Sequence, residues 1–204
     1  ILLSSNRYYY MKRKLQNVIA RTTNVLSEHA KASSFVPIGL ELEFGPNGVL
    51  PPLTFRLPDG TVMELVGRID RVDKAESSRG VLLRVIDYKS SAKTLNLTEI
   101  YYGLALQMLT YLDIVLTYAE QLVGKEAFPA GILYFHVHNP IIKSDQLLYD
   151  EKEVERKLLE QFKMRGLLLG DVEAIRLMDT QMEEGKWSLI VPAQITKKGA
   201  IHSS

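Results

Sequence analysis

The chain contains 204 residues, 46% of them hydrophobic and 24% charged, which is enough to build one sizeable core. Its formal net charge of +1 gives no overall attraction for nucleic acid, so such binding needs a local patch. The absence of cysteine excludes disulfides, thiolate zinc sites, a catalytic thiol and cysteine-held iron–sulfur clusters within these residues. No apolar run reaches about 18 residues, so we expect no membrane span and a cytoplasmic location.

The chain starts at Ile1 without an initiator methionine, and we expect it to be an excised piece of a longer protein. It shows no internal repeat and no composition shift that marks a boundary. We therefore expect a single domain over residues 1–204, with a core over about 35–140 and a helical C-terminal part over about 150–184.

Residues 6–30 space apolar side chains at helical intervals among basic ones, which predicts an amphipathic helix with a basic exposed side. Residues 38–45 alternate between apolar and acidic side chains, as a half-buried strand does. A short strand is predicted over residues 53–57, followed by a turn at residues 58–60. Residues 61–73 then form the predicted first strand of a hairpin.

A polar turn over residues 74–80 separates this strand from the apolar run 81–89, the predicted second strand of the hairpin. Asn96, with Glu99 three residues later, resembles a capping box. A long helix is predicted from there to about Val123.

The remaining elements are a strand over residues 129–138, helices over 150–165 and 171–184, and irregular chain or short strand over 185–204. The order of helix, meander, helix, strand and helices predicts an α/β fold with a mixed central sheet flanked by helices.

The second strand of the hairpin carries an acid and an amine at its end. Because side chains alternate along a strand, Asp87 and Lys89 share a face and project together. Pairing of the two strands could also bring Asp70 near Asp87. Two carboxylates suit a hard divalent cation such as Mg²⁺, which takes oxygen ligands and keeps several waters. That chemistry acts on phosphate esters.

Each of these residues also has a structural alternative. Asp87 and Lys89 would form a salt bridge at a strand end, and Asp70 would pair with Arg68 or Arg71 on a sheet edge.

Other polar residues stand in patterns that allow two interpretations. Gln107 and Tyr111 share a predicted helix face with Gly103, which leaves space for another backbone, although a polar stripe on a packed helix is the alternative. Glu41 and Glu43 alternate outward from their strand and, taken alone, are surface residues.

The histidines give weaker indications. His136 and His138 alternate on one strand face at a spacing that could ligate a metal, but with no third ligand type nearby a structural role is favoured. His29 is expected on the surface of the first helix. The chain has no phosphate-binding loop of the Gly-x-x-x-x-Gly-Lys-Ser/Thr type, so ATP use cannot reside in these residues.

Together the motifs resemble those of the RecB-like nucleases of the PD-(D/E)XK superfamily, especially the nuclease domains of bacterial AddAB-type helicase–nucleases. The matching segments, in the family's order, are Glu41–Gly45, Gly67–Asp73, Asp87–Lys89, Gln107–Tyr111 as Gln-x-x-x-Tyr, and Gly131–His136. The resemblance implies a restriction-endonuclease-like core and a Mg²⁺-dependent deoxyribonuclease, with Mn²⁺ as an alternative ion. It further implies an exonuclease that acts in double-strand-break repair and recombination.

The resemblance also implies residue roles. Asp70 and Asp87 would be metal ligands, with the carbonyl of Tyr88 completing the shell. Lys89 would position or help to deprotonate the attacking water. Glu41 best fits the acidic position of the family's Glu-x-x-Phe-Gly pattern.

Further implications concern the substrate and partners. Gln107 and Tyr111 would hold the DNA backbone or brace the metal-bearing strand, and the partner would be an AddA-like helicase–nuclease subunit. Two features depart from the family: His29 lacks the context of the usual upstream metal-binding histidine, and the flanking cysteines that hold an iron–sulfur cluster are absent here. Such a cluster is therefore expected in the full-length subunit only. The alternative function is a catalytically inactive module that binds DNA or scaffolds the complex.

Overall fold

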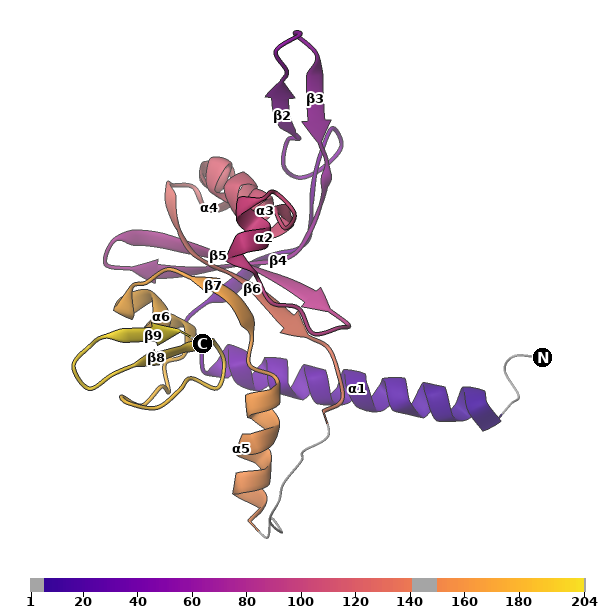
Figure 1. The fold of residues 1–204 in the computed structure, drawn as a ribbon, viewed down its shortest axis with the longest axis vertical. Coiled ribbons are helices and arrows are strands. Elements are labelled where there is room, and N and C mark those ends of the chain that lie inside the picture. The colour runs from indigo at the N-terminus through magenta and orange to yellow at the C-terminus, as the bar shows by residue number, and fades with distance from the viewer. Residues whose placement is uncertain (1–5, 141–149, 204) are drawn as a thin grey trace.

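A five-stranded sheet organises the computed structural model, which describes residues 6–140 and 150–203 (Figure 1). The strands, in their order across the sheet, are β1 (Val36–Phe44), β4 (Gly67–Ser77), β5 (Gly80–Lys89), β6 (Ala127–His136) and β7 (Arg165–Leu168). The β5–β6 pair is parallel and the other pairs are antiparallel. The predicted α/β class with a mixed central sheet is confirmed.

Helices cover both faces of this sheet (Figure 1). On one face, which we name the α3 face, lie α2 (Leu97–Tyr101), α3 (Gln107–Thr117) and α4 (Ala119–Val123). On the other, the α1 face, lie α1 (Asn6–Lys31), α5 (Glu151–Gln161), α6 (Val172–Met178) and the hairpin of β8 (Ala193–Ile195) and β9 (Ile201–Ser203). None of the described helices is long and apolar enough to cross a membrane.

Each face of the sheet has its own hydrophobic core, and strand β5 contributes to both. Leu83 and Val85 pack with Met108 of α3, whereas the alternate residue Ile86 packs with Phe135 in the core of the α1 face. Strands buried on both faces have continuous apolar runs, which explains the composition of β5. The same alternation sends Asp87 to the α3 face and the ring of Tyr88 to the α1 face.

The predicted strand 61–73 is wrong in its extent, because it is two strands. Strand β2 (Leu53–Arg56) pairs with β3 (Val62–Leu65) in a separate hairpin that projects from the sheet, and β4 begins only at Gly67 (Figure 1). A Cβ at Gly67 would lie 2.8 Å from the Phe44 ring, so this close pairing with β1 requires glycine. The turn of the central hairpin is also shorter than predicted, since β4 continues to Ser77 and β5 starts at Gly80.

The long helix predicted up to Val123 is wrong as well, because the chain breaks it into α2, α3 and α4. Asn96 caps α2 as predicted, by accepting a hydrogen bond from the Thr98 N–H (2.9 Å). Gly103 then adopts a left-handed conformation (φ 75°), which ends helices. Gly103 therefore lies before α3 and does not share its face with Gln107 and Tyr111.

The predicted helix 150–165 ends at Gln161, and sequence analysis missed the edge strand β7 that follows. A Cβ at Gly166 would lie 2.0 Å from the Ile132 carbonyl oxygen, so only glycine permits this pairing with β6. The helix predicted over 171–184 ends at Met178, and the short strands β8 and β9 agree with the prediction for residues 185–204.

Candidate active site

The acid and the amine at the end of β5 meet as predicted. Asp87 and Lys89 follow the buried residues of β5 on the α3 face, and Lys89 Nζ lies 2.6 Å from Asp87 Oδ2. The side chain of Asp87 is 5% exposed and that of Lys89 is 29% exposed, so the pair opens to solvent only through the lysine.

Asp70 joins this pair from the neighbouring strand. Arg71 lies opposite Ile86 in the antiparallel register, which places Asp70 opposite Asp87. The backbone N–H of Tyr88 donates to Asp70 Oδ2 at 2.8 Å, which fixes the Asp70 carboxylate beside the end of β5. The structure thus brings together Asp70, Asp87 and Lys89, the three groups on which the sequence prediction depended.

Electrostatics couple the three groups. Burial raises the pKa of Asp87, and the negative charge of Asp70 raises it further, while the contact and charge of Lys89 oppose the shift. For Lys89, burial alone would lower the pKa, but Asp87, together with the charges of Asp70 and Tyr134, raises it above its ordinary value. Lys89 is therefore charged at neutral pH, and Asp87 carries an unfavourable negative charge that a further cation would relieve.

The donor set suits a hard cation better than a soft one. Asp87 Oδ2 is buried, and the cation that it contacts is the ammonium group of Lys89 at 2.6 Å. The backbone of Tyr88 lies between the two acidic groups, while its ring packs edge-on to Phe135 (5.9 Å between centroids) on the α1 face. Among the described residues no group of three His, Cys, Asp or Glu side chains could hold a metal. Two carboxylates fit Mg²⁺, which keeps several waters, and do not fit a structural zinc site.

Glu41 lies on β1, in the backbone position opposite Asp70, between the pairs Leu40–Arg71 and Leu42–Ile69. Its φ of 51° is unusual for a non-glycine residue, although the pairing with β4 keeps its register on both sides of it. The Glu41 carboxylate forms an ion pair with Arg68 (2.7 Å) in which both side chains are about 60% exposed. Its role in the site stays a prediction.

Gln107 and Tyr111 lie on the first turns of α3, on the same face of the sheet as Asp87. Gln107 Nε2 donates to Tyr111 Oη at 2.8 Å, and the Tyr111 ring packs edge-on against Phe44 of β1 (5.9 Å). This contact holds Tyr111 over the sheet and leaves the amide oxygen of Gln107 as an exposed acceptor.

Sequence reasoning missed two neighbours of the aspartates. Tyr134 of β6 lies opposite Asp87, with Lys89 Nζ 6.0 Å from its ring centroid, and Arg165 of β7 lies opposite Tyr134. The parallel pairing of β5 and β6 could have indicated Tyr134, but Arg165 fell in a predicted helix.

The histidines take no part in this cluster. His29 is buried (6% exposed), not on the helix surface as predicted, because it packs edge-on against Phe135 on the α1 face. The rings of His136 and His138 stack on each other at 3.9 Å, as expected of a structural pair.

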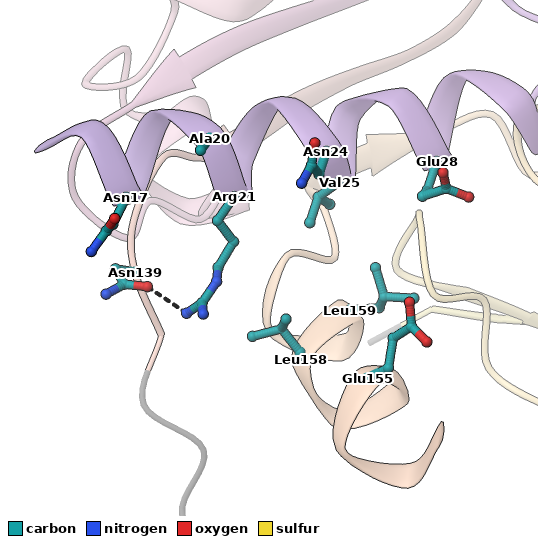
Figure 2. Close-up of a pocket in the computed structure, with 10 residues that line it drawn as sticks. All are labelled: Asn17, Ala20, Arg21, Asn24, Val25, Glu28, Asn139, Glu155, Leu158 and Leu159. Atoms are coloured by element: carbon teal, nitrogen blue, oxygen red, sulfur yellow. Dashed lines mark hydrogen bonds between the residues drawn. The ribbon is translucent and has the colours of Figure 1, made fainter. Parts of the chain in front are cut away.

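A cavity of about 540 Å³ lies elsewhere, between α1 and α5 (Figure 2). Arg21 reaches across it to the side-chain oxygen of Asn139 (2.5 Å), and Leu158 and Leu159 close its α5 side. It lies on the α1 face, away from Asp87, and contains no pair of neighbouring carboxylates with a lysine. We therefore place the candidate site at the end of β5.

Comparison with known proteins gives consistent results. Residues 2–187 match the family described as the PD-(D/E)XK nuclease superfamily. The chain is 78% identical over 203 residues to a subunit of the ATP-dependent helicase/deoxyribonuclease of Geobacillus kaustophilus and 61% identical over 203 residues to the corresponding subunit of Bacillus subtilis. Each match covers 100% of this chain and 17% of the relative, so the chain spans about a sixth of the length of these curated relatives.

Proposed function

The chain belongs to the PD-(D/E)XK nuclease superfamily, and from that premise we propose that it is a Mg²⁺-dependent deoxyribonuclease domain with its active site at Asp70, Asp87 and Lys89. The observation that carries the proposal is the convergence of two carboxylates and one ammonium group at the end of β5.

The two aspartates have the role of metal ligands in this proposal, with the Tyr88 carbonyl between them. When bound there, a Mg²⁺ ion supplies Lewis-acid polarisation of the scissile phosphodiester and lowers the pKa of a bound water. Asp70 is held ready by the Tyr88 N–H, and Asp87 is held by its buried strand.

Lys89 is proposed to position the attacking water and to stabilise negative charge on the phosphate. The contact with Asp87 raises the pKa of Lys89, which favours its charged form as a hydrogen-bond donor. Gln107 and Tyr111, linked by their hydrogen bond, are proposed to contact the DNA backbone from α3. Glu41 remains a candidate for a supporting role through Arg68.

We further propose that the chain is one domain of a larger, AddB-like subunit, since its curated relatives are about six times longer and are named as subunits of ATP-dependent helicase/deoxyribonucleases. In that setting the domain would act as an exonuclease during double-strand-break repair and recombination, together with an AddA-like partner subunit. An iron–sulfur cluster in such a subunit would need cysteines outside these residues.

The test is strand cleavage by the full-length protein in its complex, with the nuclease of the partner subunit inactivated. Asp87→Asn should lower the cleavage rate by about 10³-fold or more, which corresponds to about 4 kcal/mol of transition-state stabilisation, while ATP hydrolysis is unchanged. Asp113→Asn, an exposed acid on α3, is the matched control and should cleave at the wild-type rate.

Wild-type cleavage by Asp87→Asn would reject the proposed active site. If this variant and the wild type both assembled and bound DNA with no specific Mg²⁺ or Mn²⁺ binding, the alternative of a non-cleaving scaffold would stand.

A further inference from the structure

A basic notch, formed by Lys89, Lys93, His136, Lys163 and Arg165, lies beside the candidate active site. The chain after β5 forms one wall, β6 supplies the floor, and the segment from the end of α5 to β7 forms the opposite wall. Every titratable side chain at its surface is basic, apart from the phenol of Tyr134.

The sheet register places this notch relative to the aspartates. Asp87 lies opposite Tyr134, and Tyr134 lies opposite Arg165, so these three residues form one row across β5, β6 and β7. Residues opposite one another on neighbouring strands project from the same face. With strands about 4.8 Å apart, the backbone of Arg165 is about 10 Å from that of Asp87.

Three cations of the notch have no carboxylate within ion-pair distance in the part of the chain that the structure describes. Among the residues that the structure describes, Lys93, Lys163 and Arg165 form no ion pair within 4 Å, whereas Lys89 pairs with Asp87. Lys163 Nζ lies 5.4 Å from the Trp187 ring, which orients it without neutralising its charge.

Burial disfavours the charged forms of two basic groups of the notch. Burial lowers the pKa of His136, and the charges of His138 and Arg165 lower it further. Burial also lowers the pKa of Lys163, while the charge of Glu160 partly opposes this. An anion between these groups would relieve both effects.

The notch continues into a groove. A neighbouring cavity of about 400 Å³ shares Gln161, Lys163 and Arg165 with it. This cavity is also lined by Thr94 and Leu95 and by one carboxylate, that of Glu160. The groove therefore begins at Lys89 and runs between the segment after β5 and strand β7. An extended DNA strand could follow this groove away from the aspartates.

We propose that the mouth of the basic notch, whose interior of about 20 Å³ has room for a water molecule, binds a backbone phosphodiester of the DNA strand next to the phosphodiester that is cut, with Lys93, Lys163 and Arg165 as its ligands; this inference rests on the proposed function. Ammonium and guanidinium groups recognise phosphate without reading the base, so the contact is independent of sequence. It would hold the strand on one side of the scissile bond.

The test compares two double variants of the full-length complex, supplied with single-stranded DNA so that unwinding is bypassed. In Lys163→Ala/Arg165→Ala we expect the KM for DNA to rise about tenfold, with kcat at saturating DNA within about twofold of wild type. A plot of the logarithm of the binding constant against the logarithm of salt concentration has a negative slope. In the variant this slope should be less steep by about 0.7 for each phosphate that is no longer neutralised. Lys197→Ala/Lys198→Ala removes the same charge from the turn between β8 and β9 and should change neither quantity.

Lys93→Ala is a second variant, in the exposed segment after β5, where a substitution should not disturb folding. We expect it to raise KM and reduce the salt dependence by less than the double variant does. Equal KM and salt slope in the notch variants and the control would overturn the inference. A defect confined to oligonucleotides with a 5′-phosphate would also overturn it, because the notch would then bind a terminal phosphate. If Asp87→Asn abolishes cleavage while the notch variants behave as wild type, only this inference fails and the proposed active site stands.

Discussion

The two faces of the β4–β5 hairpin carry clusters of charge that differ in the sign of the excess charge. On the α1 face, Asp73 is fully buried and accepts hydrogen bonds from Arg71 Nε (2.6 Å) and Nη2 (3.0 Å) and from Arg84 Nε (2.9 Å). Arg84 also lies 4.5 Å from the Phe35 ring, and Arg71 Nη1 donates to Tyr88 Oη (3.4 Å).

On the α3 face, Asp70 and Asp87 repel each other and share one lysine. Adjacent residues of the same strands therefore form a buried cluster with one excess positive charge on one side and a cluster with one excess negative charge on the other. The buried cluster holds the strands together, while the acidic cluster has capacity for a cation. The difference yields predictions that separate stability from activity.

The largest expected effect is on stability and comes from Asp73. Asp73→Asn would leave two buried arginines without a countercharge, so we expect the free energy of unfolding to fall by about 3–5 kcal/mol. Urea unfolding of the variant measures this. Glu76→Gln, which breaks the exposed pair with Lys125 on the same strand, is the control and should change stability by less than about 1 kcal/mol. Equal stability of both variants would show that the α1-face cluster is not structural.

The next effect concerns pH and His29, which also lies on the α1 face. Burial, with the charges of Arg84 and Arg71, lowers the pKa of His29 from 6.5 to about 4 in the folded chain. Between these values the unfolded state binds more protons, so stability present above pH 6.5 is lost as pH falls towards 4.

His29→Phe retains an aromatic ring against Phe135 and has no group that titrates in this range. As pH falls from 6.5 to 4, its free energy of unfolding should therefore exceed that of the wild type by an amount that grows to about 3 kcal/mol. Thermal or urea unfolding at several pH values measures the difference. If the free energy of unfolding fell equally for the variant and the wild type between pH 6.5 and 4, the prediction would be contradicted.

A smaller effect, mainly on activity, is expected at Lys89. Lys89→Met keeps the apolar stem but removes the ammonium group, so cleavage should slow by about 10²-fold, with a smaller loss of stability than in Asp73→Asn because Lys89 is partly exposed. Single-turnover cleavage by the full-length complex measures the rate. Lys125→Met, which removes an exposed lysine from an ion pair, serves as the matched control. A large fall in Tm with unchanged cleavage would make Lys89 a structural residue like Arg71.

The sequence predicted the α3-face cluster because its information is local. Alternation along β5 placed Asp87 and Lys89 together, and a hairpin between adjacent strands brought Asp70 to them. The fold class followed from the same patterns. The Arg71–Asp73–Arg84 cluster was not recognised, since nothing in the local pattern showed that both arginines would be buried.

Features that depend on distant pairing were beyond the sequence. The burial of His29 depends on Phe135, and the placement of Arg165 depends on Gly166 fitting against β6. The conformation of Glu41, with its positive φ and its partner Arg68, likewise arises from its position on an edge strand. In these cases tertiary contacts determine the structure, and the local secondary-structure propensity of the residues does not.

The central claim is that Asp70 and Asp87 hold one divalent ion between them. Anomalous diffraction from crystals of the full-length protein soaked in Mn²⁺ tests it most directly. We expect a peak at about 2.1 Å from a carboxylate oxygen of each aspartate, and its loss in Asp87→Asn. A wild-type crystal with no peak there, from protein that cleaves DNA in the same Mn²⁺ buffer, would contradict the claim.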